Sequence, residues 1–175
     1  MSEELDNFVF KTAMGWVGVS ASAKGLLAVT LPQSMDIEKA THIPSAFNNL
    51  VERLKAYYRG LEVIFPDKLD LTGATTFQYA VWTATQCIPY GETRGYRWIA
   101  ERIGQPRATR AVGQALSRNP WAIIVPCHRV VASDGRLGGF GGGLAMKRRL
   151  LQMEAATRVR GANQRTGKGV RGIGC

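Results

Sequence analysis

The alternation of apolar and polar positions near the N-terminus predicts β structure. Three short runs rich in β-branched and aromatic residues are separated by glycines, at residues 8–13, 15–21 and 25–31. Residues 32–44 break this pattern with prolines at both ends and predict a connection with room for a short helical turn. These features predict a small sheet at the start of the chain.

Helical spacing replaces the alternation from residue 45 onward. Apolar residues recur at three- and four-residue steps between Ser45 and Gly60, which predicts an amphipathic helix with Ser45 as its N-cap and Gly60 as its stop. Similar spacing predicts four later helices, at residues 76–85, 92–104, 107–117 and 144–156. The middle two are joined by the short break Gly104-Gln-Pro106, which makes them a helix-turn-helix candidate.

The segments between these helices complete the expected organisation. Residues 122–125 form a short apolar run typical of a strand, and residues 135–143 are rich in glycine. We predict an α/β (α+β) fold with an N-terminal sheet-and-helix lobe at residues 1–70 and a mostly helical lobe at residues 71–156. Residues 157–175 contain five Lys or Arg and no acid, so we expect a basic, flexible tail.

Charge is unevenly distributed along the chain. The net charge is +10, and residues 71–175 carry 16 Lys and Arg against 4 acids, whereas residues 1–70 carry 7 against 9. A basic half is expected for a protein that binds a polyanion, most simply nucleic acid. A solvated basic face explains the composition equally well, so charge alone does not decide between the two.

Simple features exclude several classes of protein. The chain has no run of eighteen apolar residues, and its acidic N-terminus lacks the apolar region of a secretory signal, so we expect a cytoplasmic protein. Three cysteines without framework spacing do not indicate disulfides, and we expect Cys87 and Cys175 to be small, inert residues. The only histidines are His42 and His128, and none of these residues has zinc-site spacing. We therefore expect no metal and no cofactor.

Residues 126–129, Pro-Cys-His-Arg, carry the strongest candidate chemistry. A thiolate is a strong nucleophile, but a free thiol is only slightly ionised at neutral pH. His128 could accept the proton of Cys127 directly or through a water, and Arg129 adds positive charge that favours the thiolate. Glu154 on the last predicted helix is the best candidate to orient the imidazole. An isolated cysteine is more often a buried structural residue, and it is the neighbouring histidine and glycine segment that favour catalysis here.

The glycine-rich segment Gly138-Gly-Phe-Gly-Gly-Gly143 has three interpretations. A phosphate cradle would need Gly-x-x-x-x-Gly-Lys-Ser/Thr spacing, which is absent, and a flexible linker would not carry a central aromatic residue. A backbone wall for a flat ligand would use the missing side chains. We favour this third interpretation because the segment follows Cys127 closely in the chain.

At these residues the sequence resembles the O6-alkylguanine-DNA alkyltransferases, also called methylated-DNA–protein-cysteine methyltransferases. The most specific shared motif is Pro126-Cys-His-Arg-Val130, and the resemblance extends over most of residues 77–154. The other matching segments are Ile88-Pro-Tyr-Gly-Glu-Thr93, Tyr96, Ile99-Ala100, Ile103-Gly104, Arg110-Ala-Val-Gly113, Asn119-Pro120, Gly142-Gly143, Lys147, Leu150-Leu151 and Glu154. Residues 1–70 resemble the family only in layout.

The resemblance implies direct DNA repair by a monomer that acts on double-stranded DNA. An alkyl group would move irreversibly from O6 of guanine to Cys127, with O4-alkylthymine as a further candidate substrate. His128 would activate Cys127 through a water, and Glu154 would orient the imidazole. Asn119 would brace this turn, and Tyr96 would donate its hydroxyl to N3 of the flipped guanine.

The resemblance also implies how the base is held. The carbonyls of Cys127 and Val130 would read the exocyclic amine, Leu116 would pack on the base, and the N–H of Gly141 would approach O6. Many members carry Tyr followed by Ser where this chain has Phe140 and Gly141. A hydroxyl that could stabilise the leaving base is therefore missing.

On the DNA side, the resemblance implies that Arg110 fills the space vacated by the extruded nucleotide. Small residues on the same helix would let it lie in the minor groove, unlike helix-turn-helix proteins that read the major groove. Extruding a base costs a few kcal/mol, which phosphate contacts must offset. The other candidate DNA-binding residues are Ala108, Thr109, Gly113, Arg97 and Ser133.

Three other functions are compatible with parts of this pattern. A noncatalytic alkylated-base binding protein is disfavoured by Cys127, because relatives of that type replace the acceptor cysteine. A helix-turn-helix regulator predicts sequence-specific binding, and a cysteine hydrolase predicts burst kinetics with esters or amides. Some family members bind zinc in the N-terminal lobe, but the ligands are missing here.

Overall fold

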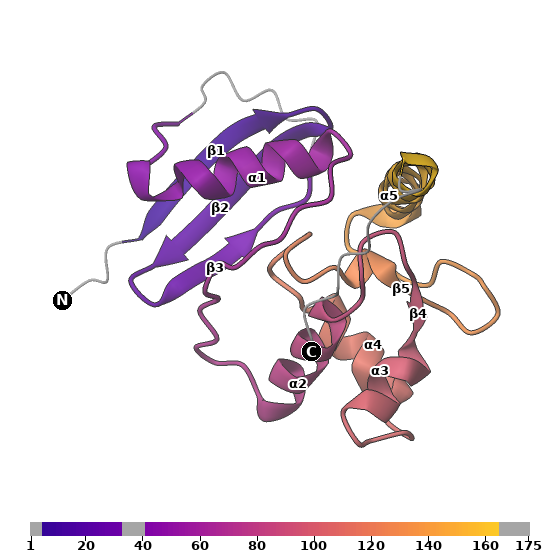
Figure 1. The fold of residues 1–175 in the computed structure, drawn as a ribbon. Helices are drawn as coiled ribbons and strands as arrows, with labels where there is room; N and C mark the ends of the chain where they lie inside the picture. The colour runs from indigo at the N-terminus through magenta and orange to yellow at the C-terminus, as the bar shows by residue number, and fades with distance from the viewer. Residues whose placement is uncertain (1–4, 33–40, 165–175) are drawn as a thin grey trace.

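A three-stranded antiparallel sheet opens the computed structural model, which describes residues 5–32 and 41–164 (Figure 1). The strands are β1 (Asp6–Thr12), β2 (Gly15–Ser22) and β3 (Gly25–Val29), paired in the order β1-β2-β3. Phe8 lies opposite Val19 and Phe10 opposite Val17, and all four side chains are buried. The prediction of strands in this region is confirmed, and the alternation places one face of the sheet in the core.

Helix α1 (Asn48–Tyr58) lies across that sheet and buries Leu50, Val51 and Leu54 (Figure 1). The expected N-cap is wrong, because Ser45 begins a short 3-10 turn, η1 (Ser45–Phe47), and no side-chain cap bond forms. The expected stop is confirmed. Gly60 has φ of +88° and its N–H donates to the carbonyl of Tyr57, a left-handed ending that favours glycine.

The second half of the chain is mostly helical. Its elements are α2 (Thr76–Gln86), β4 (Arg94–Gly95), α3 (Tyr96–Arg102), α4 (Thr109–Ser117), η2 (Cys127–Arg129), β5 (Val130–Val131) and α5 (Gly143–Gln164). Helix α3 begins at Tyr96 and not near residue 92, because Arg94 and Gly95 pair in parallel with β5. Helices α3 and α4 pack together through a turn in which Gly104 has φ of +72°, so the helix-turn-helix arrangement is present.

Residues 122–125 do not form the expected strand. They are a series of turns in which Ile123 has φ of +72° and the N–H of Val125 donates to the carbonyl of Trp121. Their apolar side chains are buried for the most part, which explains the strand-like pattern. The turns rest on the edge of the N-terminal sheet, where Val29 donates to the carbonyl of Pro120 at 2.9 Å and accepts from Ala122 at 2.9 Å.

Helix α5 continues beyond residue 156 to Gln164, so the first part of the expected tail is helical. Contacts with the rest of the protein hold this extension: Arg158 pairs with Glu92 at 3.1 Å, and the Thr157 hydroxyl donates to the carbonyl of Gly60. Residues 165–175 lie outside the described residues. One cluster of buried apolar side chains includes residues of both halves, and none of the described helices has the length and hydropathy needed to span a membrane.

Candidate active site

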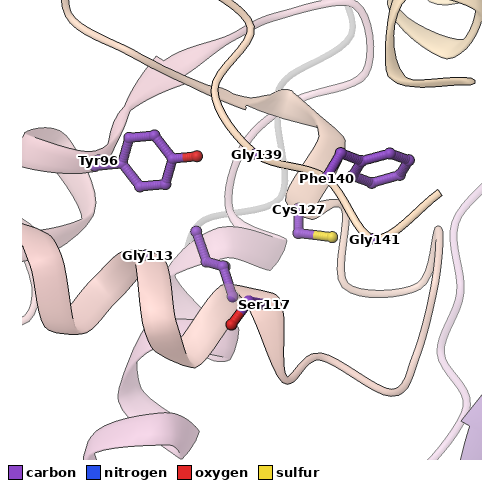
Figure 2. A pocket seen from close by; sticks show the side chains of 8 residues that line it. Tyr96, Gly113, Ser117, Cys127, Gly139, Phe140 and Gly141 are labelled. Atoms are coloured by element: carbon purple, nitrogen blue, oxygen red, sulfur yellow. The ribbon is translucent and has the colours of Figure 1, made fainter. Parts of the chain in front are cut away.

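A cavity of about 430 Å³ lies between α3, α4 and the glycine-rich segment. Figure 2 shows Tyr96 on one side and Phe140 on the other, with Cys127 between them. The residues that line the cavity are Tyr96, Gly113, Leu116, Ser117, Cys127, Gly139, Phe140 and Gly141. Its volume falls in the range of about 300–1,000 Å³ that is usual for small-molecule pockets.

Cys127 begins η2 and is half-buried at the wall of this cavity. The Asn119 side chain holds the turn that leads to it: its Nδ2 donates to the carbonyl of Val125 at 2.9 Å, and its Oδ1 accepts from the N–H of Trp121 at 3.0 Å. The same Nδ2 lies 3.3 Å from the Cys127 Sγ. A single amide side chain therefore bridges both ends of this turn and also contacts the sulfur.

Behind the sulfur, the buried carboxylate of Glu154 collects donors from several elements. His128 Nε2 lies 2.8 Å from Oε1, and the Arg129 guanidinium donates to both oxygens at 3.0 Å. The N–H of Gly91 donates to Oε2 at 3.0 Å, and the Tyr57 hydroxyl donates to Oε1 at 2.6 Å. Burial disfavours the carboxylate, but the hydrogen bond from His128 and the Arg129 guanidinium outweigh it and hold the pKa of Glu154 at about 2.

The contact with Glu154 fixes the proton of His128. An ionised carboxylate only accepts, so Nε2 carries the proton and Nδ1 presents a lone pair. Nδ1 is buried and has no hydrogen-bond partner among the described residues. Burial lowers the pKa of His128 although Glu154 opposes the shift, so the imidazole is neutral at neutral pH. A neutral imidazole with a free lone pair is the state required of a general base.

The hydrogen bonds of Arg129 go to groups other than the thiol whose ionisation it was expected to favour. Its guanidinium donates to Glu154 and to the carbonyl of Ile88 at 2.8 Å, so its charge is matched by the carboxylate. Burial raises the pKa of Cys127, and the opposing influences are the Asn119 hydrogen bond and the positive charge of Lys147. Lys147 is fully buried, its Nζ donates to the carbonyl of Val130 at 2.6 Å, and burial lowers its pKa to about 8.

The residues expected to hold the nucleobase fall into two groups. Tyr96, Leu116, Phe140 and Gly141 line the cavity together with Cys127. Val130 does not line it. Its side chain is buried, and its carbonyl accepts from Lys147.

The residues expected to bind DNA are also divided. Arg110 and Thr109 are exposed at the start of α4, and Ala108 is half-buried just before it. Gly113 faces inward and lines the cavity, where a Cβ would lie 3.7 Å from the Tyr96 ring. The two remaining candidates are both exposed: Arg97, which pairs with Glu101 at 2.8 Å, and Ser133.

Sequence reasoning assigned no role to three residues of this region. Ser117 lines the cavity, and Tyr57 and Lys147 contact the groups around the nucleophile, whereas Gly139 lines the cavity within the segment that was expected to form its wall. Lys147 had a usable signal, because it follows Gly143 by four positions and precedes Leu150 by three, on the inward face of its helix. Tyr57 had none, since its partners lie far away in the sequence.

Other sites receive no support from the described residues. Among residues 5–32 and 41–164, no group of three or more His, Cys, Asp or Glu side chains is placed to hold a metal ion. Cys87 is a free, half-buried cysteine whose Sγ lies 3.5 Å from the carbonyl of Thr83. His42 is exposed, and Cys175 lies outside the described part of the chain.

Comparisons with known proteins identify relatives of this chain. Residues 76–156 match the family model described as 6-O-methylguanine DNA methyltransferase, DNA binding domain. A methylated-DNA–protein-cysteine methyltransferase of Mycobacterium tuberculosis is 54% identical over 111 residues, which cover 63% of this chain and 67% of that protein. One from Methanosarcina acetivorans is 41% identical over 155 residues, which cover 85% of this chain and 97% of that protein.

Solved structures show the same likeness over both lobes. The Mycobacterium tuberculosis OGT in complex with DNA has a TM-score of 0.74 and 43% identity, covering 85% of this chain and 92% of that one. An O6-methylguanine-DNA methyltransferase from Pyrococcus kodakaraensis, at 24% identity and a TM-score of 0.57, shares the fold.

Proposed function

The chain belongs to the methylated-DNA–protein-cysteine methyltransferase family, and we propose that Cys127 is the residue that accepts the alkyl group. The activity of this family is DNA repair by alkyl transfer, and DNA is the partner of this chain. The observation that carries the assignment to Cys127 is its position in the wall of the cavity, next to a neutral His128 that is held by a buried carboxylate.

The transfer exchanges one bond for another. The Cys127 sulfur attacks the alkyl carbon, an S–C bond forms, and the bond between that carbon and guanine O6 breaks. The thiol proton passes through a water to Nδ1 of His128, the atom that has a lone pair and no partner among the described residues. Tyr96 donates its hydroxyl to N3 of guanine, so the base does not leave with a full negative charge.

The cavity suits a flat base. Leu116 packs on the plane of the base, and the N–H of Gly141 approaches O6. The carbonyls of Cys127 and Val130 already accept from the Val130 N–H and from Lys147, but each carbonyl oxygen retains a second lone pair for the exocyclic amine. Phe140 supplies a ring without a hydroxyl, and O4-alkylthymine is a further candidate substrate.

The exposed start of α4 is the proposed DNA-binding surface. Arg110 fills the gap left by the extruded nucleotide, while Ala108 and Thr109 let the helix approach the minor groove. Arg97 and Ser133 add contacts from neighbouring segments, and the net charge of +10 favours binding to a polyanion. We expect a monomer that acts in the cytoplasm.

Each molecule acts once, because a thioether offers no easy route back to the thiolate. A protein that only binds alkylated nucleobases would not need a nucleophile next to a general base. The presence of Cys127 in the cavity wall therefore favours transfer over binding alone.

Intact-mass spectrometry tests the assignment. The reduced protein is incubated with duplex DNA that contains O6-methylguanine, and the protein is weighed and then mapped by peptide. We expect one added methyl group on Cys127, at most one per molecule, and none in Cys127→Ser. Unchanged mass of the folded wild-type protein, or a methyl group that persists in Cys127→Ser, would overturn the proposal.

A further inference from the structure

Tyr57 reaches from the N-terminal lobe into the groups behind the nucleophile. It lies near the end of α1, is 1% exposed, and donates its hydroxyl to Glu154 Oε1 at 2.6 Å. The same hydroxyl lies 3.1 Å from His128 Nε2. One phenol therefore touches both members of the pair that we assign to general-base catalysis.

Packing does not account for this hydroxyl. The Tyr57 ring makes edge contacts with Tyr58, Phe65 and Tyr90, and a phenylalanine ring would make them equally well. Its neighbour Tyr58 is equally buried, but the Tyr58 hydroxyl has no hydrogen-bond partner among the described residues. The two tyrosines thus differ in chemistry and not in burial, which makes Tyr58 a matched control.

The charges around the pair explain what the hydroxyl does. Arg129 and the N–H of Gly91 also donate to Glu154, and the positive charge of Lys147 acts on both His128 and Cys127. Oε1 is the oxygen that holds the His128 proton, and Tyr57 donates to that same oxygen. When two donors share one carboxylate oxygen, each hydrogen bond weakens the other. The Tyr57 hydroxyl therefore weakens the attraction of Oε1 for the proton on His128 Nε2.

We propose that Tyr57 is a positioning residue that sets the proton affinity of the His128–Glu154 pair from the N-terminal lobe. The inference rests on the proposed role of His128 as the base for Cys127. Without the hydroxyl, more of the negative charge of Glu154 acts on His128, and its imidazolium form becomes more stable. The pKa of His128, which burial holds below its usual value, then rises.

The rate of alkylation as a function of pH measures this effect. Free O6-benzylguanine is the probe, because it reacts without DNA, and benzylation of Cys127 is followed by intact mass between pH 5 and 8. The wild-type rate should decrease as the pH is lowered, because the imidazolium form of His128 cannot accept a proton. The pH at which the rate is half its maximum then reports the pKa of His128. In Tyr57→Phe this midpoint moves upward by about 0.5 to 1 pH unit, whereas Tyr58→Phe leaves it unchanged.

A second variant separates chemistry from packing. A monofluorinated tyrosine at position 57 keeps the shape and is a stronger donor, so it should move the midpoint downward, opposite to Tyr57→Phe. A merely structural role predicts the same sign, or no shift, for both variants. Matching midpoints in Tyr57→Phe, Tyr58→Phe and the wild-type protein would also overturn the proposal.

His128→Gln distinguishes this inference from the function on which it rests. If the acid limb of the wild-type profile persists unchanged in His128→Gln, His128 is not the base and both ideas fail. If that limb disappears in His128→Gln but does not move in either Tyr57 variant, the base is correct and only the role of Tyr57 is wrong.

Discussion

Replacing Glu154 with glutamine should destabilise the protein more than any change of an exposed carboxylate. The carboxylate is fully buried and accepts from His128, Arg129, Tyr57 and the Gly91 N–H, which belong to three separate parts of the chain. Glutamine keeps the size but has no charge, and its NH₂ group would face donors. Loss of the carboxylate therefore weakens the contacts that join the N-terminal lobe to the helical lobe.

The magnitude follows from the ionisation of Glu154. Its pKa of about 2, against the usual 4.5, corresponds to about 3 kcal/mol of stability at pH 7. Because the folded-state pKa is depressed, this contribution is complete above the usual pKa and is lost as the pH falls toward 2, with about 0.8 kcal/mol gone by pH 4. Glu154→Gln also leaves Arg129, 10% exposed, without its counter-charge, and breaking a buried pair in this way costs about 3–5 kcal/mol.

Urea unfolding at pH 7 and pH 4 measures both effects. Glu154→Gln should lower the free energy of unfolding by about 3–5 kcal/mol at pH 7, and its deficit should shrink by about 0.8 kcal/mol at pH 4. Glu52→Gln is the control, because Glu52 pairs with Lys55 on the exposed side of α1 and should cost less than about 1 kcal/mol. Equal, small losses in the two variants would refute the reasoning.

Two further predictions concern rates of transfer. Arg110→Ala should slow repair of duplex DNA about tenfold or more, because extrusion costs a few kcal/mol, and should leave the reaction with free O6-benzylguanine unchanged; equal slowing of both would discredit the extrusion role. Gly138→Ala should slow the reaction with the free base about tenfold to hundredfold, because its Cβ would lie 2.6 Å from the Tyr96 hydroxyl. Gly135→Ala, with φ of +80° and no atom within 4 Å of the added Cβ, is its control, and comparable rates in the two variants would contradict the collision.

Local patterns were sufficient to predict most helices and strands, and they failed where distant segments decide. The strands of the first thirty residues and the end of α1 at Gly60 depend on neighbours in the sequence. The start of α3 does not, because Arg94 and Gly95 pair with a strand that lies far along the chain. Residues 122–125 are apolar and for the most part buried, like a strand, but their hydrogen bonds are those of turns, with one to the distant Val29 and one from the Asn119 side chain to the carbonyl of Val125.

For the site, the sequence indicated which residue types matter but not how they are connected. Cys127, His128 and Glu154 were predicted from adjacency and a family motif, and the structure brings all three together. Adjacency in the chain suggested that the charge of Arg129 favours the thiolate, whereas its guanidinium donates to Glu154. Tyr57 could not be found, since a tyrosine on an amphipathic helix is ordinarily a core residue.

Burial raises the pKa of Cys127, so only a small fraction of the sulfur is ionised at rest. A small resting fraction of thiolate is an advantage for a nucleophile that is used only once. A permanent thiolate reacts with oxidants and with other electrophiles, and each such event would consume the molecule. In the proposed mechanism the proton of Cys127 leaves when His128 accepts it, and the lowered pKa of His128 keeps the imidazole neutral at neutral pH. The proposed mechanism thus confines ionisation of the thiol to the transfer step, and the buried Lys147 charge, which no carboxylate matches in the described ion pairs, favours the thiolate.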